Sequence, residues 1–232
     1  MADEPLRRNF YGRVHGKTLR ASQKDYLARD LESLRLRGVA VHENPSRAAL
    51  DPQAIFASPR PLWVEIGFGG GEHLVHMAAR YPDIGIIGCE PFVNGVAMLL
   101  GKIRNAGVGN LAIHPGDARD LFDVLPDASV AKAFLNYPDP WPKARHHRRR
   151  FVTPGYLALL ARVMMPGAEF RVATDIPDYV RQTLEEVPKA GFDLVAQGGV
   201  GDAWEDWTST RYEQKALREG RDPHYLTFRR NA

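Results

Sequence analysis

The chain has 232 residues, of which 44% are hydrophobic and 25% are charged, and its formal net charge at pH 7 is +3. These values predict one large globular domain with short additions. A single cysteine, Cys89, excludes a disulfide framework, and the lack of a long apolar run excludes a membrane span and a signal-peptide core. We therefore expect a cytoplasmic protein that does not enter a membrane.

The N-terminal segment is rich in basic residues and poor in apolar ones, so we predict a mobile basic arm over residues 1–21. It is either a solubilising tail or a segment that RNA orders. Helical spacing then predicts a helix from Ser22 to Arg37, with Gly38 as its stop. This helix opens a helical extension and a proline-punctuated linker over residues 22–60, which lead into the main domain at residues 61–232.

From Leu62 onward, apolar runs of strand length alternate with segments whose apolar residues recur at helical spacing. Strands are predicted at residues 62–66, 84–89, 111–114, 130–135 and 170–173, and two more at 192–195 and 226–228. Helices are predicted at residues 73–81, 93–103, 153–165 and 179–187. This alternation predicts an α/β fold built on a doubly wound, mostly parallel sheet with helices on both faces.

A glycine-rich turn, residues 67–71, follows the first predicted strand. Glycines allow a tight turn and let a ligand approach the backbone closely. Two acids disfavour a dinucleotide there, because Glu72 stands where the third glycine of that fingerprint belongs and Glu65 would repel a pyrophosphate but suit a cationic ligand. Acids that could accept from ribose hydroxyls and from an adenine amino group follow the second and third strands, at Glu90 and Asp117-Ala118.

This acid-Gly-x-Gly turn, with acids after the next two strands, resembles the S-adenosylmethionine-dependent methyltransferases of the Rossmann-like class. The resemblance implies a seven-stranded sheet whose last strand is antiparallel. It also implies S-adenosyl-L-methionine as the cofactor and S-adenosyl-L-homocysteine as its product. The residues alone also allow ordinary strand-end acids, although three acids at successive strand tips favour a cofactor site.

A rigid loop, Asn136 to Lys143, follows the fourth predicted strand. Its three prolines fix φ and withhold three backbone donors, so it cannot lie in the middle of a helix or a sheet. The loop runs into a basic segment, residues 145–150. Its carboxylate and aromatic rings suit a nucleic-acid base, and the basic segment suits the phosphates, whereas the alternative is a solvated basic loop.

The loop and the basic segment closely resemble the signature of bacterial tRNA (guanine-N7)-methyltransferases, with Tyr137 where that family more often has Phe. Further matches lie at Gly88 to Glu90 and at Thr174-Asp175. The resemblance implies an enzyme that forms 7-methylguanosine in the variable loop of tRNA, with Asp139 as the catalytic acid. N7 of neutral guanine carries no proton, so Asp139 would orient the base and stabilise charge, while Asp175 and Glu213 would read the base edge.

The resemblance and the turn together assign three sets of residues. The cofactor-binding set is Glu65, Gly67, Gly69, Gly71, Glu90, Asp117, Ala118, Asn136 and Asp139. The substrate-binding set is Lys143, Asp175, Thr210, Arg211, Tyr212 and Glu213. The RNA-binding set is Arg145, His146, His147, Arg148, Arg149 and Arg150. No metal is expected, because adjacent histidines without matching acids or cysteines lack ligand spacing.

Other interpretations remain open at this point. Thr210 and Glu213 also match a capping box, and Asp175 could cap the helix after the fifth strand. The chain could be another RNA or DNA base methyltransferase, a nicotinamide-dependent oxidoreductase, or a non-catalytic RNA-binding protein. We expect tRNA as the partner and a monomer as the oligomeric state, with a homodimer as the alternative.

Overall fold

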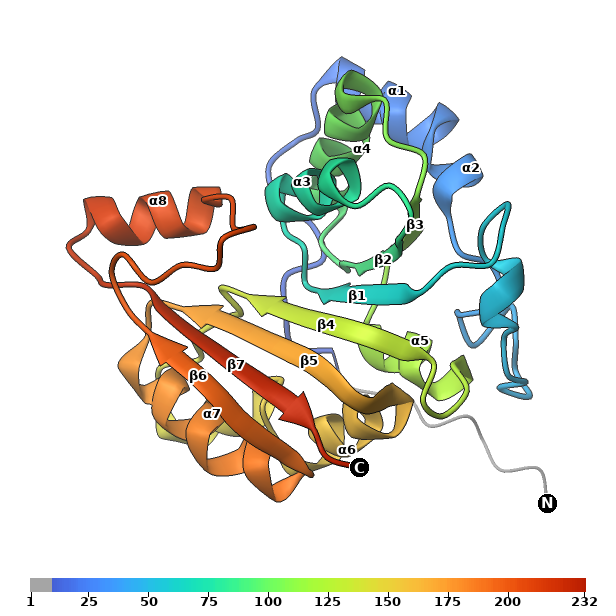
Figure 1. Cartoon of the computed structure of the whole chain (residues 1–232). Coiled ribbons are helices and arrows are strands. Elements are labelled where there is room, and N and C mark those ends of the chain that lie inside the picture. The colour runs from blue at the N-terminus through green and yellow to red at the C-terminus, as the bar shows by residue number, and fades with distance from the viewer. Residues whose placement is uncertain (1–9) are drawn as a thin grey trace.

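The computed structural model describes residues 10–232 and contains one seven-stranded sheet in the order β3-β2-β1-β4-β5-β7-β6 (Figure 1). Strands β1 to β5 run parallel to one another, and β7 runs antiparallel to both of its neighbours, β5 and β6. This arrangement confirms the predicted Rossmann-like sheet with its last strand antiparallel. The strands are β1 Leu62–Ile66, β2 Gly85–Cys89, β3 Leu111–His114, β4 Val130–Asn136, β5 Met164–Thr174, β6 Phe192–Gly198 and β7 His224–Arg230.

Helices cover both faces of the sheet, as predicted. One apolar core lies between the sheet and α5 (Ala118–Val124), α6 (Pro154–Val163) and α7 (Pro177–Lys189). The second lies on the other face, under α3 (Glu72–Arg80) and α4 (Val93–Ala106), and the N-terminal helix α1 (Ala21–Arg29) packs onto it (Figure 1). Helix α8 (Arg211–Arg218) lies beyond the strand tips, between β6 and β7 in the chain.

The structure corrects two predicted helices and adds one. The expected helix at residues 22–37 breaks at Asp30 into α1 and α2 (Leu31–Leu34), and Arg35 is already extended. The reason is the free edge of β3, where Arg35 bridges to Ile113 and the Leu36 N–H donates to the Ile113 carbonyl at 2.8 Å. The helix expected at residues 153–165 ends at Val163, because β5 begins there. Helix α5 was not predicted.

The described part of the N-terminal arm, residues 10–20, lies against the start of α4. The Val93 N–H donates to the Val14 carbonyl at 2.9 Å, and Asn94 exchanges hydrogen bonds with Gly16 and Lys17. The remainder of the predicted arm, residues 1–9, lies outside the described residues. Over residues 10–232, no helix is long and apolar enough to cross a membrane.

Helix α4 approaches the glycine turn closely at Gly95. A Cβ added there would lie 2.3 Å from the Gly69 carbonyl oxygen, a backbone atom that cannot move aside cheaply. Gly69 and Gly71 have φ values of 55° and 77°, which L side chains rarely adopt. The turn after β1 can therefore pack closely between the sheet and α4 only because glycines stand at these positions.

We predict that Gly95→Ala lowers the free energy of unfolding by about 1–3 kcal/mol, because overpacking forces the backbone apart. Chemical denaturation measures the change. The matched control is Gly155→Ala in α6, where a Cβ would meet nothing within 4 Å. That variant should be more stable by about 0.5–1 kcal/mol. Equal stability of Gly95→Ala and the wild type would contradict the close approach.

Candidate cofactor and substrate site

A pocket of about 350 Å³ opens at the carboxyl ends of the parallel strands. Parallel sheets bind ligands at this edge, where the strand order reverses between β1 and β4. The predicted residues that line it are Gly67, Gly69, Glu90, Asp117, Ala118, Asp139, Arg149, Arg150 and Tyr212. Residues 10–13 of the arm also line it, which the sequence did not reveal. Three predicted cofactor residues, Glu65, Gly71 and Asn136, are not part of the lining.

Glu90 joins the glycine turn to the start of α4. Its carboxylate accepts from the Gly69 N–H at 2.7 Å and from the Phe92 N–H at 2.9 Å, one bond on each oxygen. Burial raises the pKa of Glu90, and the nearby charge of Asp139 raises it further, whereas the two backbone donors lower it. Each oxygen retains a second lone pair. Glu90 can therefore hold the turn and still accept from a ligand hydroxyl.

Asp117 caps α5 and pairs with a neighbouring arginine. Its carboxylate accepts from the backbone N–H of Arg119 at 2.9 Å and from the Arg119 Nε at 2.9 Å, and the guanidinium lies 4.3 Å from the centre of the Tyr156 ring. These contacts fix the carboxylate at the pocket wall. Arg119 was not predicted, although its position two residues after the acid is the available signal.

Glu65 belongs to a buried polar group that also contains His73 and Asn136, which are 2%, 2% and 7% exposed. The Nδ1 atom of His73 lies 2.8 Å from Oε2 of Glu65, and Nδ2 of Asn136 lies 3.5 Å from Oε1. The Oδ1 atom of Asn136 is buried and has no hydrogen-bond partner among the described residues. The sequence does not identify His73 as a functional candidate, because this residue belongs to the apolar stripe of a predicted helix. The one sign of a special role in the sequence is that a polar residue stands in that stripe.

The proline loop after β4 has an unusual backbone. Tyr137 and Trp141, neither of them glycine, have φ values of 48° and 41°, and such residues cost about 1–3 kcal/mol each. Asp139 lies between them, where water still reaches its side chain. The surrounding protein nevertheless desolvates the carboxyl and raises its pKa, against the lowering effect of Arg13. The two left-handed residues on either side of Asp139 therefore have to be maintained by other contacts.

Glu213 is the centre of an aromatic cluster behind the loop. It is 3% exposed and accepts from Tyr137 Oη at 3.2 Å, from Trp207 Nε1 at 3.0 Å and from Tyr225 Oη. Burial, followed by the Glu213 charge or its hydrogen bond, raises the pKa of both tyrosines, so both remain donors. The Glu213 carboxylate therefore accepts from three side-chain donors of the protein itself.

Thr210 caps α8, because its Oγ1 accepts from the Glu213 N–H at 3.2 Å. The N-cap half of the capping-box interpretation is confirmed, but the box is incomplete because the Glu213 side chain does not return the bond to the Thr210 backbone. Asp175 does not cap α7, whose N-cap is Ile176, and its carboxylate instead accepts from Arg221 Nε at 2.5 Å. Arg211 and Tyr212 lie at the start of α8 beside the pocket, and the Tyr212 ring lies over Gly69.

The basic segment forms a 3-10 helix, η2 (Ala144–Arg149), and its side chains are not alike. Lys143, Arg145 and Arg148 are exposed. Arg149 lies over the rings of Tyr11 and Trp141, at 4.7 and 4.9 Å from their centres. The remaining residues turn inward to different degrees: His146 has its ring edge against Trp141, His147 lies 3.3 Å from Asp178, and Arg150 is fully buried.

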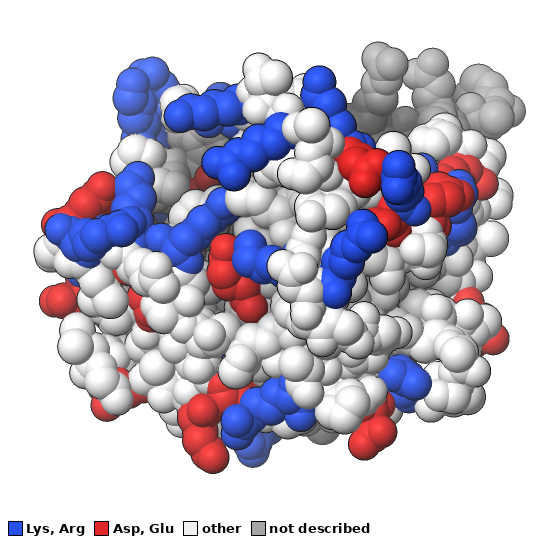
Figure 2. Space-filling model, turned by 90° about the horizontal axis from the view of Figure 1, so that it is seen from above, with Lys and Arg blue, Asp and Glu red and all other residues white. Residues whose placement is uncertain are grey.

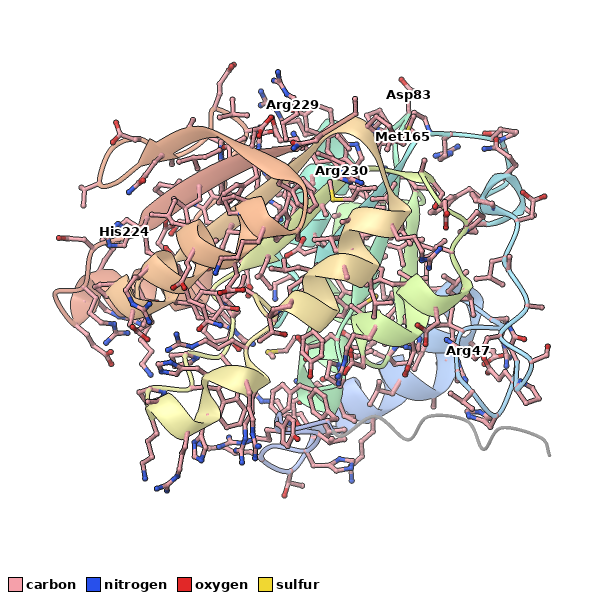
Figure 3. The ribbon with its side chains drawn as sticks, turned by 90° about the horizontal axis from the view of Figure 1, so that it is seen from below. Arg47, Asp83, Met165, His224, Arg229 and Arg230 are labelled. Carbon is pink, nitrogen blue, oxygen red and sulfur yellow. The ribbon has the colours of Figure 1, made fainter. Side chains whose placement is uncertain are left out.

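Figure 3, viewed from below, shows η2 beside the N-terminal arm, far from Arg229 and Arg230 at the end of β7. In the part of the chain that the structure describes, no three His, Cys, Asp or Glu side chains are grouped so that they could hold a metal ion.

The seven-stranded sheet with its glycine turn after β1 is the framework of a Rossmann-like methyltransferase. A family model described as "Putative methyltransferase" matches residues 59–226. Among solved structures, a mutant 16S rRNA (adenine(1408)-N(1))-methyltransferase with its cosubstrate SAM, from Catenulisporales acidiphilia, has a TM-score of 0.53 at 16% identity, covering 80% of this chain and 93% of that chain. That likeness concerns the fold alone.

Closer relatives define the family. A tRNA (guanine-N(7)-)-methyltransferase of Paracoccus denitrificans is 78% identical over 98% of this chain and 97% of its own length. Another, of Cereibacter sphaeroides, is 76% identical over 99% of this chain and 94% of its own length. The chain belongs to the tRNA (guanine-N(7)-)-methyltransferase family. The resemblance that rested on the proline loop and the basic segment is thereby confirmed.

The raised pKa of Asp139 has a measurable effect on stability. A carboxyl whose folded pKa lies above its unfolded pKa favours the protonated folded protein, so its charge opposes folding at neutral pH and ceases to do so as the pH falls through the folded pKa. We predict that Asp139→Asn raises the melting temperature of the ligand-free protein at pH 7.5. The gain should shrink as the pH approaches the ordinary carboxyl range.

The control for this prediction has the opposite sign. The hydrogen bond from Arg150, followed by one from Arg181, lowers the pKa of Asp178. Its charge therefore contributes stability that is present at neutral pH and lost as the pH falls through the folded pKa. Asp178→Asn should lower the melting temperature at pH 7.5. Two variants that shift in the same direction at this pH would show that the charge environments are wrongly assigned.

Proposed function

We propose that this chain transfers a methyl group from S-adenosyl-L-methionine to N7 of a guanine in the variable loop of tRNA. The observation that carries the proposal is Asp139, which the strained loop holds at the rim of a pocket also lined by Glu90 and the glycine turn. Membership of the family supports it independently. The proposal implies that the protein acts in the cytoplasm, where tRNA is modified.

The residues present fit the proposed cofactor. A Cβ at Gly67 would meet nothing within 4 Å, so the backbone there is open to a ligand. The buried Oδ1 atom of Asn136 lacks a donor, and its chain neighbours Leu135 and Tyr137 both line the pocket. An amino group would satisfy it, and the free lone pairs of Glu90 would accept from ribose hydroxyls. When bound, S-adenosyl-L-methionine would supply an electrophilic methyl carbon on a sulfonium.

For the methyl transfer itself, the main task of the protein is to position the guanine. N7 of neutral guanine has a lone pair and no proton, so no residue has to act as a general base. Positive charge moves onto the purine during transfer, and the carboxylates of Asp139 and Glu90, which both line the pocket, would stabilise it. Fixed geometry is worth about 7–11 kcal/mol of barrier, whereas one charge-assisted hydrogen bond is worth about 1.5–3 kcal/mol. Positioning of the base by Asp139 should therefore dominate.

The distribution of charge supports a polyanionic substrate. Lys143, Arg145 and Arg148 are exposed beside the loop, and Lys215 and Arg218 are exposed along α8. Figure 2 shows that Lys and Arg side chains gather on the upper part of the face viewed from above. Cations spread over several elements can contact successive phosphates of a folded RNA and release its counterions.

We predict that Asp139→Ala abolishes methyl transfer and leaves the affinity for tRNA within a few-fold of wild type, because the phosphate contacts remain. Unmodified tRNA and labelled S-adenosyl-L-methionine provide the assay, and digestion to nucleosides identifies the product. Label recovered on an exocyclic amine would favour a different base methyltransferase. Binding of tRNA by the wild type without incorporation would favour a non-catalytic RNA-binding protein.

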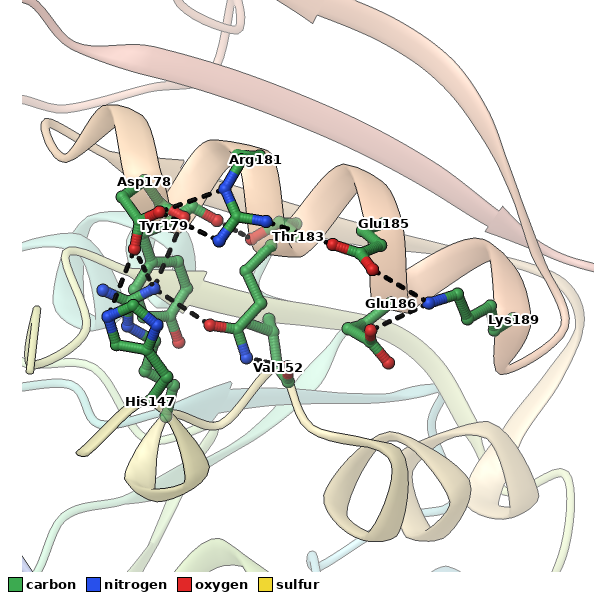
Figure 4. A network of polar contacts seen from close by, with 11 residues as sticks. His147, Val152, Asp178, Tyr179, Arg181, Thr183, Glu185, Glu186 and Lys189 are labelled. Carbon is green, nitrogen blue, oxygen red and sulfur yellow. Dashed lines mark hydrogen bonds and ion pairs between the residues drawn. The ribbon is translucent and has the colours of Figure 1, made fainter. Parts of the chain in front are cut away.

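A second prediction concerns the salt dependence of binding. Replacing both Arg145 and Arg148 by Ala should weaken tRNA binding and reduce its salt slope by about 0.7–0.9 log units for each phosphate that the variant no longer neutralises. The charge-matched control replaces Arg181 and Lys189 of α7, which pair with acids of their own helix (Figure 4). That control should retain the wild-type slope. Equal slopes for both double variants would remove η2 from the RNA-binding surface.

A further inference from the structure

Arg150 ends the basic segment in the sequence, yet it is the largest fully buried side chain among the described residues. It is 1% exposed, and its guanidinium lies 5.2 Å from the centre of the Tyr179 ring in α7. Although it forms part of the inner pocket wall, such a side chain has almost no surface to offer to a phosphate. Its role must therefore be sought among its contacts inside the protein.

The guanidinium joins two segments that are distant in the chain. One edge reaches the proline loop, where Nε donates to the Pro140 carbonyl at 2.9 Å and Nη2 donates to the Trp141 carbonyl at 3.4 Å. The other edge reaches α7, where Nη1 donates to Asp178 Oδ2 at 2.8 Å and to Gln182 Oε1 at 2.9 Å. Figure 4 shows the α7 side of this network, the contacts around Asp178, which His147 and Arg181 also face.

The two carbonyls belong to the residues that directly follow Asp139. Trp141 has a left-handed backbone, which persists only where surrounding contacts over-determine it. The opposite end of the loop has its own anchors, because the Tyr137 N–H donates to the Ala173 carbonyl at 2.7 Å and its hydroxyl donates to Glu213. Asp139 thus lies between an anchor on β5 and α8 and an anchor on α7.

We propose that Arg150 is a positioning residue, which fixes Asp139 by fastening the proline loop to α7, and that it does not contact tRNA. The inference rests on the proposed function, since it concerns the placement of the residue that orients the base. It also explains why arginine stands there. A planar guanidinium donates from both edges at once, whereas the ammonium of lysine is a single point with three donors.

The test compares Arg150→Lys with the wild type in single-turnover methylation, tRNA binding and hydrogen exchange. We expect the rate at saturating tRNA to fall about 100-fold, the cost of a displacement near 1 Å. We expect tRNA affinity within 3-fold and an unchanged salt slope, because every phosphate keeps its cation. Exchange of the amides in residues 137–143 should rise in the absence of tRNA. A reduced salt slope with a wild-type rate would overturn the proposal.

Two further variants separate positioning from general loss of stability. Arg230→Met removes another carbonyl-capping arginine, one that binds Ala161 and Gly191 far from the pocket (Figure 3). It should lower stability and retain the rate; an equal loss of rate would contradict the proposal. Gln182→Leu removes one Arg150 partner and should reduce the rate several-fold. If Arg150→Lys does not fold, a full wild-type rate in Gln182→Leu overturns the proposal.

The same measurements distinguish this inference from the proposed function. A wild-type enzyme that methylates no tRNA refutes the proposed function. Faster exchange in residues 137–143 of Arg150→Lys, with no change in exchange elsewhere, would then still establish the anchor. If the wild type methylates tRNA but Arg150→Lys shows the same amide exchange in residues 137–143 as the wild type, the anchor is refuted and the proposed function is not.

Discussion

The parallel hydrogen bonding of β1 to β2 on one side and to β4 on the other determines where the centre of the pocket lies. Because these strands point the same way, their carboxyl ends meet at one edge, and the segments that leave them diverge there. Three stretches far apart in the sequence, the glycine turn, Glu90 and the proline loop, thereby line one pocket. Reversing any one of these strands would carry its segment to the far edge.

Several features of this pocket are energetically unfavourable. Two carboxylates, Glu90 and Asp139, share a partly desolvated space, and two residues of the loop adopt left-handed backbone. The surrounding structure offsets these costs with fixed donors and anchors. The N–H groups of Gly69 and Phe92 hold Glu90, while Glu213 and Arg150 hold the two ends of the loop. Contacts with residues around the site therefore keep the site rigid.

The sheet and the part of the pocket lining that follows its strand tips could be predicted because apolar periodicity and glycine or proline breaks are local signals, whereas residues 10–13 and Arg119 of the lining were not predicted. The remainder depends on contacts between distant segments. His73 resembled one more member of an apolar stripe, and only the fold brings it to Glu65. Arg150 resembled one more cation of a basic run, and only the fold turns it inward. The break at Asp30 likewise depends on the edge of β3, a strand that comes much later in the chain.

The position of β7 between β5 and β6 governs the order of assembly. Within residues 10–232, β6 pairs only with β7, so it cannot join the sheet until the later strand has been synthesised. Tyr225 of β7 also completes the cluster around Glu213. Glu213 in turn accepts from Tyr137 of the proline loop. The anchor of the loop on α8 is therefore complete only when the last strand of the chain has paired, so the placement of Asp139 depends on the C-terminal end of the protein.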